Sequence, residues 1–470
     1  MGISKYVPGF GESDHITTKA LKLIPYYRTY RSEYKLIQRS ESWDRERIEG
    51  YQQTRLNDLL DHAYHNVPYY RRIFEERGLT PADIRSVDEL QKLPLLTKDD
   101  VRENLEDLKA TNYSESDLEY VKTGGSTGKP LEFCYESGVT RAKEWAYMKT
   151  QWERVGYSFA DKCVVLRGEE VSAGEDRFWD TTFFGRWLVL SSYHLDDDRL
   201  PKYIAKIREF EPRYIQAYPS VISMLARYMN ENDVEPFPSV TAVLCGSEPL
   251  YSDQRELVED TLRCRVYSWY GHAERCVLAG ECEHDQQRYH VFPQYGITEL
   301  VGEDGTPIQN GETRGEIVGT GFNNWAMPLI RYRTNDIGRI EDSTCGCGRP
   351  YEIIESVDGR VQEMFVDETG RAVPLTGMHS RVGKASGNVK NAQFYQEEEG
   401  KVLLRVVTTE AYCENDSENI LSKLDTRYDN IEFEIQPVDD IERTESGKKR
   451  FLVQTLPVDT NFEDDGTTNQ

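Results

Sequence analysis

The chain has 470 residues, 38% of them hydrophobic and 30% charged, and its 82 acidic and 57 basic residues give a net charge of -25. A chain of this length can bury several cores, so we expect two or three domains. The acidic balance argues against nucleic acid and anionic membranes as partners. It fits an ordinary acidic cytosolic enzyme as well as a protein adapted to a salt-rich cytoplasm. The N-terminal residues carry no apolar signal core and no run approaches a membrane span, which predicts a cytoplasmic protein.

Helices are predicted for the first part of the chain. Apolar residues recur at spacings of three and four from about residue 51 to 105, with a stop at Gly78, and a further helix is expected at SVDELQKLPLL. Residues 139–156 predict another helix, with Trp145 and Trp152 on one face. We expect residues 1–50 to form an N-terminal helical extension.

Short apolar strands and helices then alternate up to about residue 271, which predicts an α/β sheet with its chemistry in the loops at the strand ends. After Glu281 the pattern favours strands, and SVDGRVQEM near residue 358 marks a domain boundary. The expected fold class is α/β plus α+β. A large domain of mixed sheets and helices would cover residues 51–357, and a small mobile α+β lid residues 358–457. We expect the acidic tail, residues 458–470, to be disordered.

The run TGGSTGKP at residues 123–130 raises the question of phosphate binding. A Walker loop needs a Gly five positions before the Gly of Gly-Lys and a Ser or Thr after the Lys, but Thr123 and Pro130 occupy these places. A P-loop kinase, which would release ADP, is therefore disfavoured. What remains is a Gly-rich loop with two hydroxyls and a lysine, which suits either a triphosphate or an ordinary turn.

Six motifs stand in one order along the chain: TGGSTGKP (123–130), GSEPL (246–250), YGHAE (270–274), RYRTNDIG (331–338), DGRVQ (358–362) and TESGKKR (444–450). The series resembles the adenylate-forming superfamily. It is most similar to the phenylacetate-CoA ligase-like family, including its CapK-type branch from capsule and exopolysaccharide biosynthesis. The segments AYPSV and CGCGRP are also similar to that family, and the resemblance runs from about residue 50 to 455.

The resemblance implies an ATP-dependent, AMP-forming ligase that uses Mg2+. Glu274 would bind the magnesium ion, Asp336 would bind the ribose hydroxyls, and Arg333 would contact a phosphate. Lys448 in the lid would neutralise the charge that develops between the α-phosphate and the attacking carboxylate. The nucleotide would also be held by the loop Thr123, Gly124, Gly125, Ser126, Thr127, Gly128 and Lys129, by Gly246, Ser247, Glu248, Pro249 and Tyr270 around adenine, and by Gly271 and Arg360.

Three positions depart from the family's pattern. Ala273 stands where a Ser or Thr is usual, which removes a hydroxyl near the phosphates. Gln362 occupies the hinge, where Asp or Lys is common, and the phosphate loop opens with Thr-Gly-Gly where Ser residues are common. Ala273 therefore keeps a non-catalytic nucleotide-binding protein open as an alternative. Lys448 favours an enzyme, because a binding protein needs no mobile cation at a reacting centre.

Nine cysteines in a chain without a secretion signal are better interpreted as thiols or metal ligands than as disulfides. The turn CGCGR carries Cys345 and Cys347, and Cys282 and His290 flank a predicted hairpin. Two ligands from each of two hairpins would close a tetrahedral, structural zinc site, and the family resemblance supports these residues. Cys276 and His284 lie nearby in the sequence and are substitute ligands. Reduced thiols without a bound metal remain the alternative.

The expected partner is a small-molecule carboxylic acid. Acyl transfer to coenzyme A would give a thioester, whereas the CapK-type likeness implies an amide or ester in surface polysaccharide biosynthesis. Two interpretations fit one set of aromatic residues: they line the pocket for the acid, or they belong to the hydrophobic core. The residues are Tyr218, Trp145, Trp152, Tyr193 and His194. Both kinds of acceptor are compatible with the sequence, and so is more than one class of carboxylic acid.

Overall fold

The computed structural model describes residues 16–123, 131–167, 178–182, 185–192, 198–302, 305–308, 314–341, 345–360, 364–370, 372–374, 382, 385, 386, 388–425, 430–442, 450–454 and 456. The predicted phosphate loop from Gly124 to Lys129, the hinge residue Gln362, the lid lysine Lys448 and the tail therefore lie outside the described residues. Within the described part of the chain, none of the helices has the length and apolar character that crossing a membrane requires.

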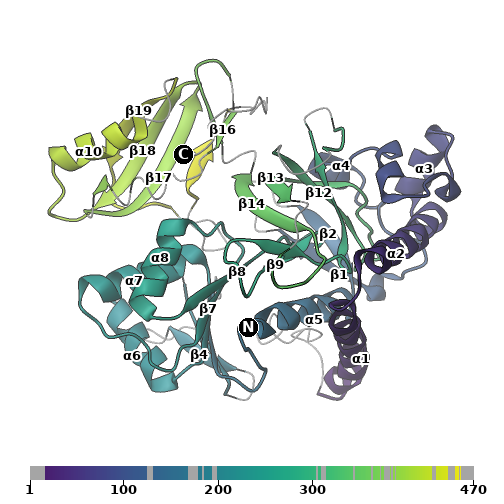
Figure 1. The fold of residues 1–470 in the computed structure, drawn as a ribbon, viewed down its shortest axis with the longest axis horizontal. Helices are drawn as coiled ribbons and strands as arrows, with labels where there is room; N and C mark the ends of the chain where they lie inside the picture. The colour runs from purple at the N-terminus through teal and green to yellow at the C-terminus, as the bar shows by residue number, and fades with distance from the viewer. Residues whose placement is uncertain are drawn as a thin grey trace.

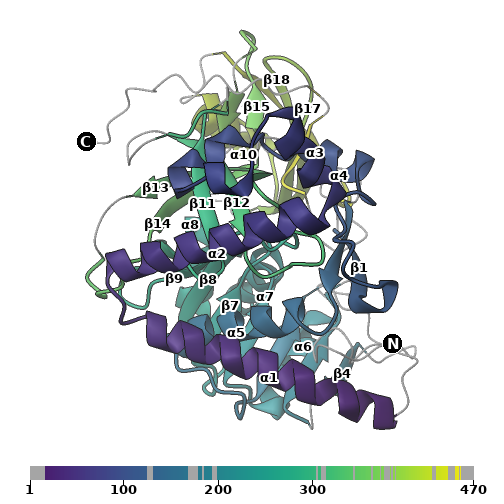
Figure 2. The ribbon, with the colours of Figure 1, turned by 90° about the vertical axis from the view of Figure 1, so that its right-hand side faces the viewer.

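The described chain begins with two long helices, which lie along one side of the large domain (Figure 2). The break between α2 and α3 falls at Val67, because the proline that follows disfavours a helical conformation there and itself begins α3. Asp44 caps α2 by accepting a hydrogen bond from Arg47 N at 2.9 Å. The helices are α1 (Ile16–Ser40), α2 (Arg45–Asn66), α3 (Pro68–Glu76), α4 (Lys98–Glu103) and α5 (Thr140–Glu153).

The helix predicted at SVDELQKLPLL is shorter and tighter than expected, a six-residue 3-10 helix over Val87–Lys92. Pro94, two residues beyond its end, disfavours a longer helix. Residue 50, the expected end of the N-terminal extension, lies inside α2.

A twelve-stranded sheet forms the centre of the molecule, in the order β11-β12-β13-β14-β10-β9-β8-β7-β6-β3-β5-β4. Neighbouring strands from β5 through β3, β6 and β7 to β8 are parallel, whereas the pairs from β8 to β11 and the edge pair β4-β5 are antiparallel. The parallel half consists of β3 (Cys163–Leu166), β5 (Trp187–Leu190), β6 (Tyr214–Ala217), β7 (Ala242–Cys245) and β8 (Arg265–Gly271), with β4 (Trp179–Thr182) at the edge. The antiparallel half consists of β9 (Leu278–Glu281), β10 (Tyr289–Val291), β11 (Gly296–Val301), β12 (Gly315–Gly321), β13 (Tyr332–Glu341) and β14 (Ile353–Arg360).

Helices cover both faces of the parallel half. Because its strands are buried on both faces, they consist of nearly continuous runs of apolar residues. On one face α6 (Leu200–Phe210), α7 (Pro219–Glu231) and α8 (Ser252–Leu262) pack on residues such as Val164, Ile215 and Val243. On the other face α5 and α1 enclose an aromatic core that includes Trp152 and Trp269. The predicted alternation of strand and helix is confirmed by this arrangement.

The C-terminal part forms a separate small sheet with its own core (Figure 1). Its order is β19-β18-β17-β20, and α10 (Glu414–Asp425) belongs to the same part. The strands are β17 (Val389–Glu398), β18 (Lys401–Thr408), β19 (Glu432–Pro437) and β20 (Leu452–Gln454), and two hairpins complete the fold, β1 (Leu118–Lys122) with β2 (Glu132–Glu136) and β15 (Met364–Val366) with β16 (Ala372–Pro374). The predicted mixed large domain with a small α+β lid is therefore confirmed as a fold.

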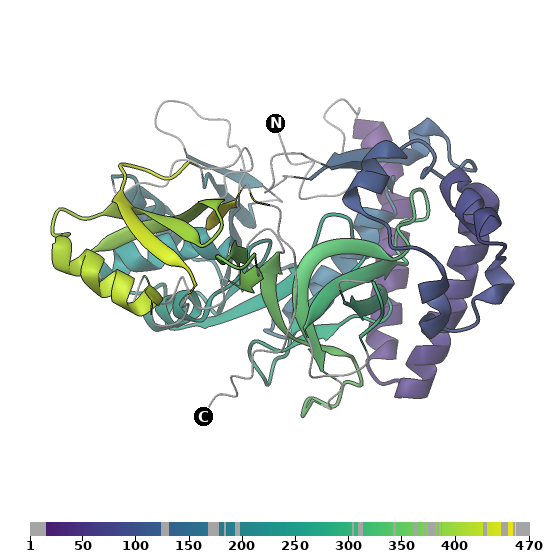
Figure 3. The same cartoon turned by 90° about the horizontal axis from the view of Figure 1, so that it is seen from above.

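The lid contacts the large domain at α7 and at the start of α8. It lies above these helices in Figure 1 and in front of them in the view from above in Figure 3. Arg227 of α7 donates to the main-chain oxygens of Val389 and Lys390 at 2.9 and 2.8 Å. The rings of Tyr251 and Phe451 lie 5.6 Å apart. The chain leaves the large sheet at Arg360, the last residue of β14, close to the predicted domain boundary.

A buried ion pair ties the two halves of the large sheet to α8. Arg255 Nη2 donates to Glu281 Oε1 at 2.5 Å, and these side chains are 5% and 0% exposed. Glu281 also accepts from the backbone N–H groups of Ser268 and Gln287 at 3.2 and 2.8 Å.

We expect Glu281→Ala to lower the free energy of unfolding by about 3–5 kcal/mol, because it removes the buried partner of Arg255 and leaves this buried charge only the more distant Glu259 carboxylate, 3.8 Å away among the described residues. Urea unfolding followed by circular dichroism measures the loss. The control is Glu209→Ala, which removes an exposed partner of Lys206 and should cost less than about 1 kcal/mol. Equal losses in the two variants would contradict the role of the buried pair.

Candidate active site

Two predicted nucleotide-site carboxylates, Glu274 in the loop after β8 and Asp336 on β13, are each held by a tyrosine. Tyr332 OH donates to Glu274 Oε1 at 2.7 Å, and Tyr270 OH donates to Asp336 Oδ2 at 2.7 Å. Glu274 and Asp336 are 8% and 7% exposed. Tyr332 and Asp336 share β13, while Tyr270 and Glu274 belong to YGHAE, so the two hydrogen bonds join two sequence-distant motifs in one site.

Glu274 stays ionised at neutral pH despite its burial. His272 Nδ1 lies 3.3 Å from Glu274 Oε2, at ion-pair distance but without the alignment of a hydrogen bond. Burial by itself raises the pKa of Glu274, but the contacts with His272 and Tyr332 outweigh it and lower the pKa to about 2. A permanently charged, inward-facing carboxylate fits the predicted magnesium ligand.

The arginines of RYRTNDIG are engaged by glutamates. Arg333 donates from Nε and Nη2 to Glu316 Oε2 at 2.8 and 2.5 Å, and Arg331 pairs with Glu299 at 3.0 Å. Arg331 is 2% exposed, so its ion pair with Glu299 lies in the interior of the domain. Arg333 keeps 34% of its side chain exposed, so its predicted phosphate contact would be made while it is paired with Glu316.

The predicted phosphate loop connects β1 and β2, which pair antiparallel up to Lys122 and Glu132. Thr123 closes the base of this connection, because its N–H donates to Leu131 O and its Oγ1 accepts from Leu131 N, both at 2.9 Å. The loop residues themselves, Gly124 to Lys129, lie outside the described part of the chain. Their predicted role stays a prediction, as does that of Lys448.

The motif GSEPL follows β7 and begins at the carboxyl end of the parallel strands. Gly246 is required there, because a Cβ would stand 2.4 Å from the Trp269 ring. Ser247 adopts a positive φ of 70°, and Glu248 accepts from Ser220 N at 3.1 Å, so the loop that also holds Pro249 is fixed at both ends. Gly271 ends β8, and Arg360 pairs through its backbone with Asp336.

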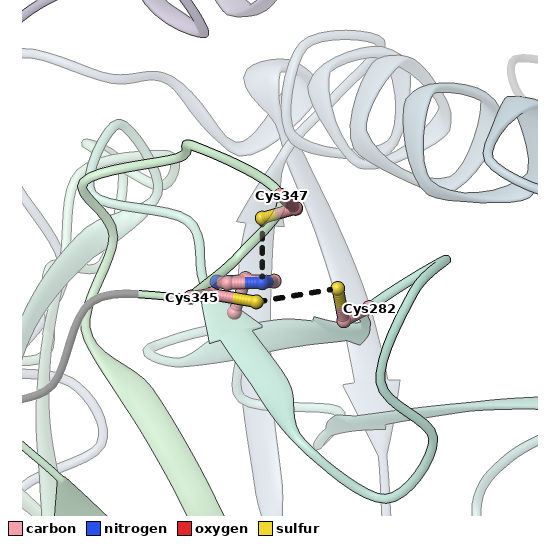
Figure 4. Close-up of side chains that lie close together, drawn as sticks. Cys282, Cys345 and Cys347 are labelled. Carbon is pink, nitrogen blue, oxygen red and sulfur yellow. Dashed lines mark hydrogen bonds between the residues drawn. The ribbon is translucent and has the colours of Figure 1, made fainter.

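The four predicted metal ligands meet in one place (Figure 4). Cys282 Sγ lies 3.6 Å from Cys345 Sγ, and Cys347 Sγ lies 3.3 Å from His290 Nε2. The four donor atoms are all within 4.8 Å of one another. Tetrahedral zinc with sulfur and nitrogen ligands sets donor atoms roughly 3.5–3.8 Å apart, so the spacing and chemistry of this set fit the metal.

The substitute ligands do not join this cluster. Cys276 is buried elsewhere, near the Glu274 carbonyl oxygen, and His284 contributes a backbone N–H to Cys282 Sγ at 3.4 Å. Burial lowers the pKa of His290 to about 3, which keeps the imidazole in the neutral form that binds metals.

Of the predicted acid-pocket aromatics, Trp145 and Trp152 belong to the core between α5 and the sheet, 5.9 Å from each other. Their spacing on the helix reflects packing on the sheet, because Trp145 lies 5.9 Å from Trp187 of β5 and Trp152 lies 5.7 Å from Trp269 of β8. Tyr218 stands at the carboxyl end of β6, while Tyr193 and His194 lie outside the described residues. The sequence analysis missed Arg167, which follows β3 and contacts Tyr218; a single arginine after an apolar strand gives no motif to find it by.

Comparison with known proteins identifies the class of this site. The chain matches the AMP-binding enzyme family over residues 179–325 and the CapK C-terminal domain family over residues 365–455. It is 25% identical to protein CapK of Staphylococcus aureus over 416 residues, 86% of this chain and 89% of that one. It is 29% identical to the phenylacetate-coenzyme A ligase of Escherichia coli K12 over 328 residues, 68% of this chain and 72% of that one.

The solved structure of 2-hydroxyisobutyryl-CoA ligase in complex with 2-HIB-AMP shares the fold, with a TM-score of 0.71 at 18% identity over 89% of this chain and 91% of that one. An anthranilate CoA ligase, AuaEII with anthranoyl-AMP, matches with a TM-score of 0.50 at 14% identity over 85% and 79% of the two chains. The family match and the ligase relatives support an ATP-dependent, AMP-forming ligase. The sequence is similar to the phenylacetate-CoA ligase-like proteins of CapK type among the adenylate-forming enzymes.

The depressed pKa of Glu274 makes a prediction about acid stability. A carboxyl group whose folded pKa lies below its ordinary value of 4.5 stabilises the fold above that pH, and the contribution is lost as the pH falls towards about 2. We expect the stability difference between wild type and Glu274→Gln to shrink by roughly 3 kcal/mol between pH 5 and pH 2. Urea titrations at several pH values measure it. The exposed control Glu49→Gln should show no such convergence, and a constant difference for Glu274→Gln would refute the assignment.

Proposed function

We propose that the protein joins a carboxylic acid to the α-phosphate of ATP and then transfers the acyl group to coenzyme A. In the first step a carboxylate oxygen attacks the α-phosphorus and the bond to pyrophosphate breaks. In the second step the thiolate sulfur of coenzyme A attacks the acyl carbon and AMP leaves. The observation that carries the proposal is the pair of buried carboxylates, Glu274 and Asp336, each fixed by a tyrosine hydroxyl at 2.7 Å.

The roles of the residues follow from charge and position. Glu274, ionised and inward-facing, would hold the magnesium ion that offsets phosphate charge. Asp336 would accept hydrogen bonds from two ribose hydroxyls, a task for which a carboxylate has enough acceptor sites. Lys448 would come from the lid to neutralise the charge between the two reacting anions. Thr123 and the loop that follows it would bind the β and γ phosphates.

A second candidate acceptor is supported by the match of the lid to the CapK C-terminal domain family over residues 365–455. In this alternative the acyl adenylate is passed to an amine or hydroxyl, which gives an amide or ester in surface polysaccharide biosynthesis. The adenylation step is common to both alternatives. Single-turnover reactions with coenzyme A or with amino sugars, scored by mass spectrometry of the acyl product, distinguish them.

Adenylation is tested with ATP, magnesium, hydroxylamine and a panel of carboxylic acids, with AMP, pyrophosphate and hydroxamate as readouts. We expect pyrophosphate and a hydroxamate from one class of acid. Lys448→Ala should lower adenylation about 100-fold while ATP binding stays close to wild type, because the cation acts on the transition state.

The control is Lys401→Ala, which changes an exposed lid lysine paired with Glu398 and should leave the rate unchanged. Undiminished adenylation by Lys448→Ala would show that the catalytic lysine is wrongly assigned. ADP as the nucleotide product would overturn the adenylation itself.

We also propose that Cys282, His290, Cys345 and Cys347 bind one structural zinc ion. The cluster is braced by Arg349, which donates to both carboxylate oxygens of Glu283 at 2.6 and 2.7 Å, and by Arg265, which donates to Cys282 O at 2.6 Å. All four tetrahedral positions would be filled by protein, so the ion would stabilise the fold without entering the reaction.

Elemental analysis of the purified protein should find about one zinc per chain, and removal by a chelator should lower the melting temperature. Cys345→Ser should lose the metal. The matched control is Cys413→Ser, which changes an exposed thiol in the lid and should retain it. Equal zinc contents in the two variants would exclude the proposed ligand set.

A further inference from the structure

The carboxyl edge of the parallel strands holds an arginine that the proposed adenylation chemistry does not use. Arg167 directly follows β3, Tyr218 directly follows β6, and Ser247 comes just after β7. Parallel neighbours end at the same edge of a sheet, which is where open α/β sheets bind their ligands. These three side chains therefore stand together at the expected place for a substrate.

The guanidinium of Arg167 is enclosed by two aromatic rings. Its Cζ lies 5.2 Å from the Tyr218 ring centre and 5.4 Å from that of Trp269. Arg167 Nη2 donates a short hydrogen bond to Ser247 Oγ. Two rings and a hydroxyl hold the planar group in one orientation, which lowers the entropy lost when it binds a second planar or tetrahedral anion.

The charge of Arg167 lacks a protein counter-charge in the described part of the chain, where no carboxylate comes within 4.0 Å of it. Its Nε is buried and has no hydrogen-bond partner there, although the side chain as a whole is half-buried. Glu248, one residue beyond Ser247, is instead directed to the backbone N–H of Ser220 at 3.1 Å. A partly desolvated cation in a ligand-binding edge attracts an anionic group of the ligand.

The arginine faces away from the nucleotide carboxylates. Adjacent side chains of a strand point to opposite faces, and β8 carries Trp269 and Tyr270 in succession. Tyr270 donates to Asp336, whereas Trp269 packs 5.7 Å from Trp152 of α5. Arg167, over the Trp269 ring, therefore lies on the opposite side of β8 from Asp336.

The Trp269 indole fills part of this edge. The Trp269 ring lies so close to Gly246 that a Cβ there would stand 2.4 Å from it. An indole in this place leaves little room for a second ring of the substrate. The edge thus combines the Trp269 indole with the fixed positive charge of Arg167.

We propose that the acid activated by this enzyme is a short dicarboxylate, whose distal carboxylate binds Arg167 while the other carboxylate reacts. This inference rests on the proposed adenylation function and adds the substrate class. Arg167 is a specificity-determining residue in this view, and Trp269 limits the chain length.

The test begins with binding in the absence of ATP, so that it does not depend on catalysis. Saturation-transfer NMR compares malonate, succinate and glutarate with propanoate, butanoate and pentanoate, and phenylacetate is included. We expect the wild type to bind at least one dicarboxylate ~10-fold or more tightly than its monocarboxylate counterpart, the effect of a hydrogen-bonded charge pair.

Arg167→Gln should abolish this preference and Arg167→Lys should retain part of it, since the charge remains but the stacked fork is lost. The control Arg45→Gln changes an exposed arginine on α2 and should behave as wild type. Equal binding of the paired acids, no binding of any dicarboxylate, or weakened ATP binding by Arg167→Gln with unchanged acid binding would each overturn the proposal.

A second measurement separates this inference from the proposed function. Acid-dependent exchange of pyrophosphate into ATP should follow the same order of acids and the same dependence on Arg167. Exchange with monocarboxylates that is indifferent to Arg167 would leave adenylation standing and remove the dicarboxylate. Arg167-dependent binding of dicarboxylates without any exchange would keep the pocket and overturn the adenylation.

Discussion

Strand β8 is the constraint on which both parts of the site depend. It is the strand at which the sheet changes direction, because it pairs parallel to β7 and antiparallel to β9. The alternation of side chains along it places Trp269 towards the α5 core and Tyr270 towards Asp336. One extended segment therefore fixes the proposed acid edge and the proposed nucleotide carboxylates relative to each other, and a slip of one residue in its pairing would exchange them.

The buried carboxylates of the antiparallel half fall into two groups that differ in charge balance. Glu316 and Glu299 are paired with Arg333 and Arg331, so they add no net charge near a triphosphate. Glu274 is held by the neutral hydroxyl of Tyr332 and by His272, and keeps a pKa of about 2. The negative charge that would bind a divalent cation is therefore already present on Glu274, and no rearrangement of the surrounding side chains is needed.

The sequence was sufficient where the signal is local or where ordered motifs add up. The strand and helix alternation, the small lid and the meeting of Cys282, His290, Cys345 and Cys347 could all be predicted. It was insufficient where the register of strands decides the partner. Nothing in RYRTNDIG shows that Arg333 of β13 pairs with Glu316 of the neighbouring strand β12. The spacing of Trp145 and Trp152 likewise fits a pocket as well as a core. Arg167 stands in no motif, so only the shared edge of β3, β6 and β7 reveals it.

The contact between α7 and the lid has a consequence for how the two domains can diverge. Arg227 donates to the main-chain oxygens of Val389 and Lys390, atoms that every residue type supplies. Substitutions at these two lid positions leave the acceptors in place, whereas a single change at Arg227 removes both bonds. The lid surface is thus free to drift in sequence, for instance towards a new acceptor molecule, while this connection to the large domain persists.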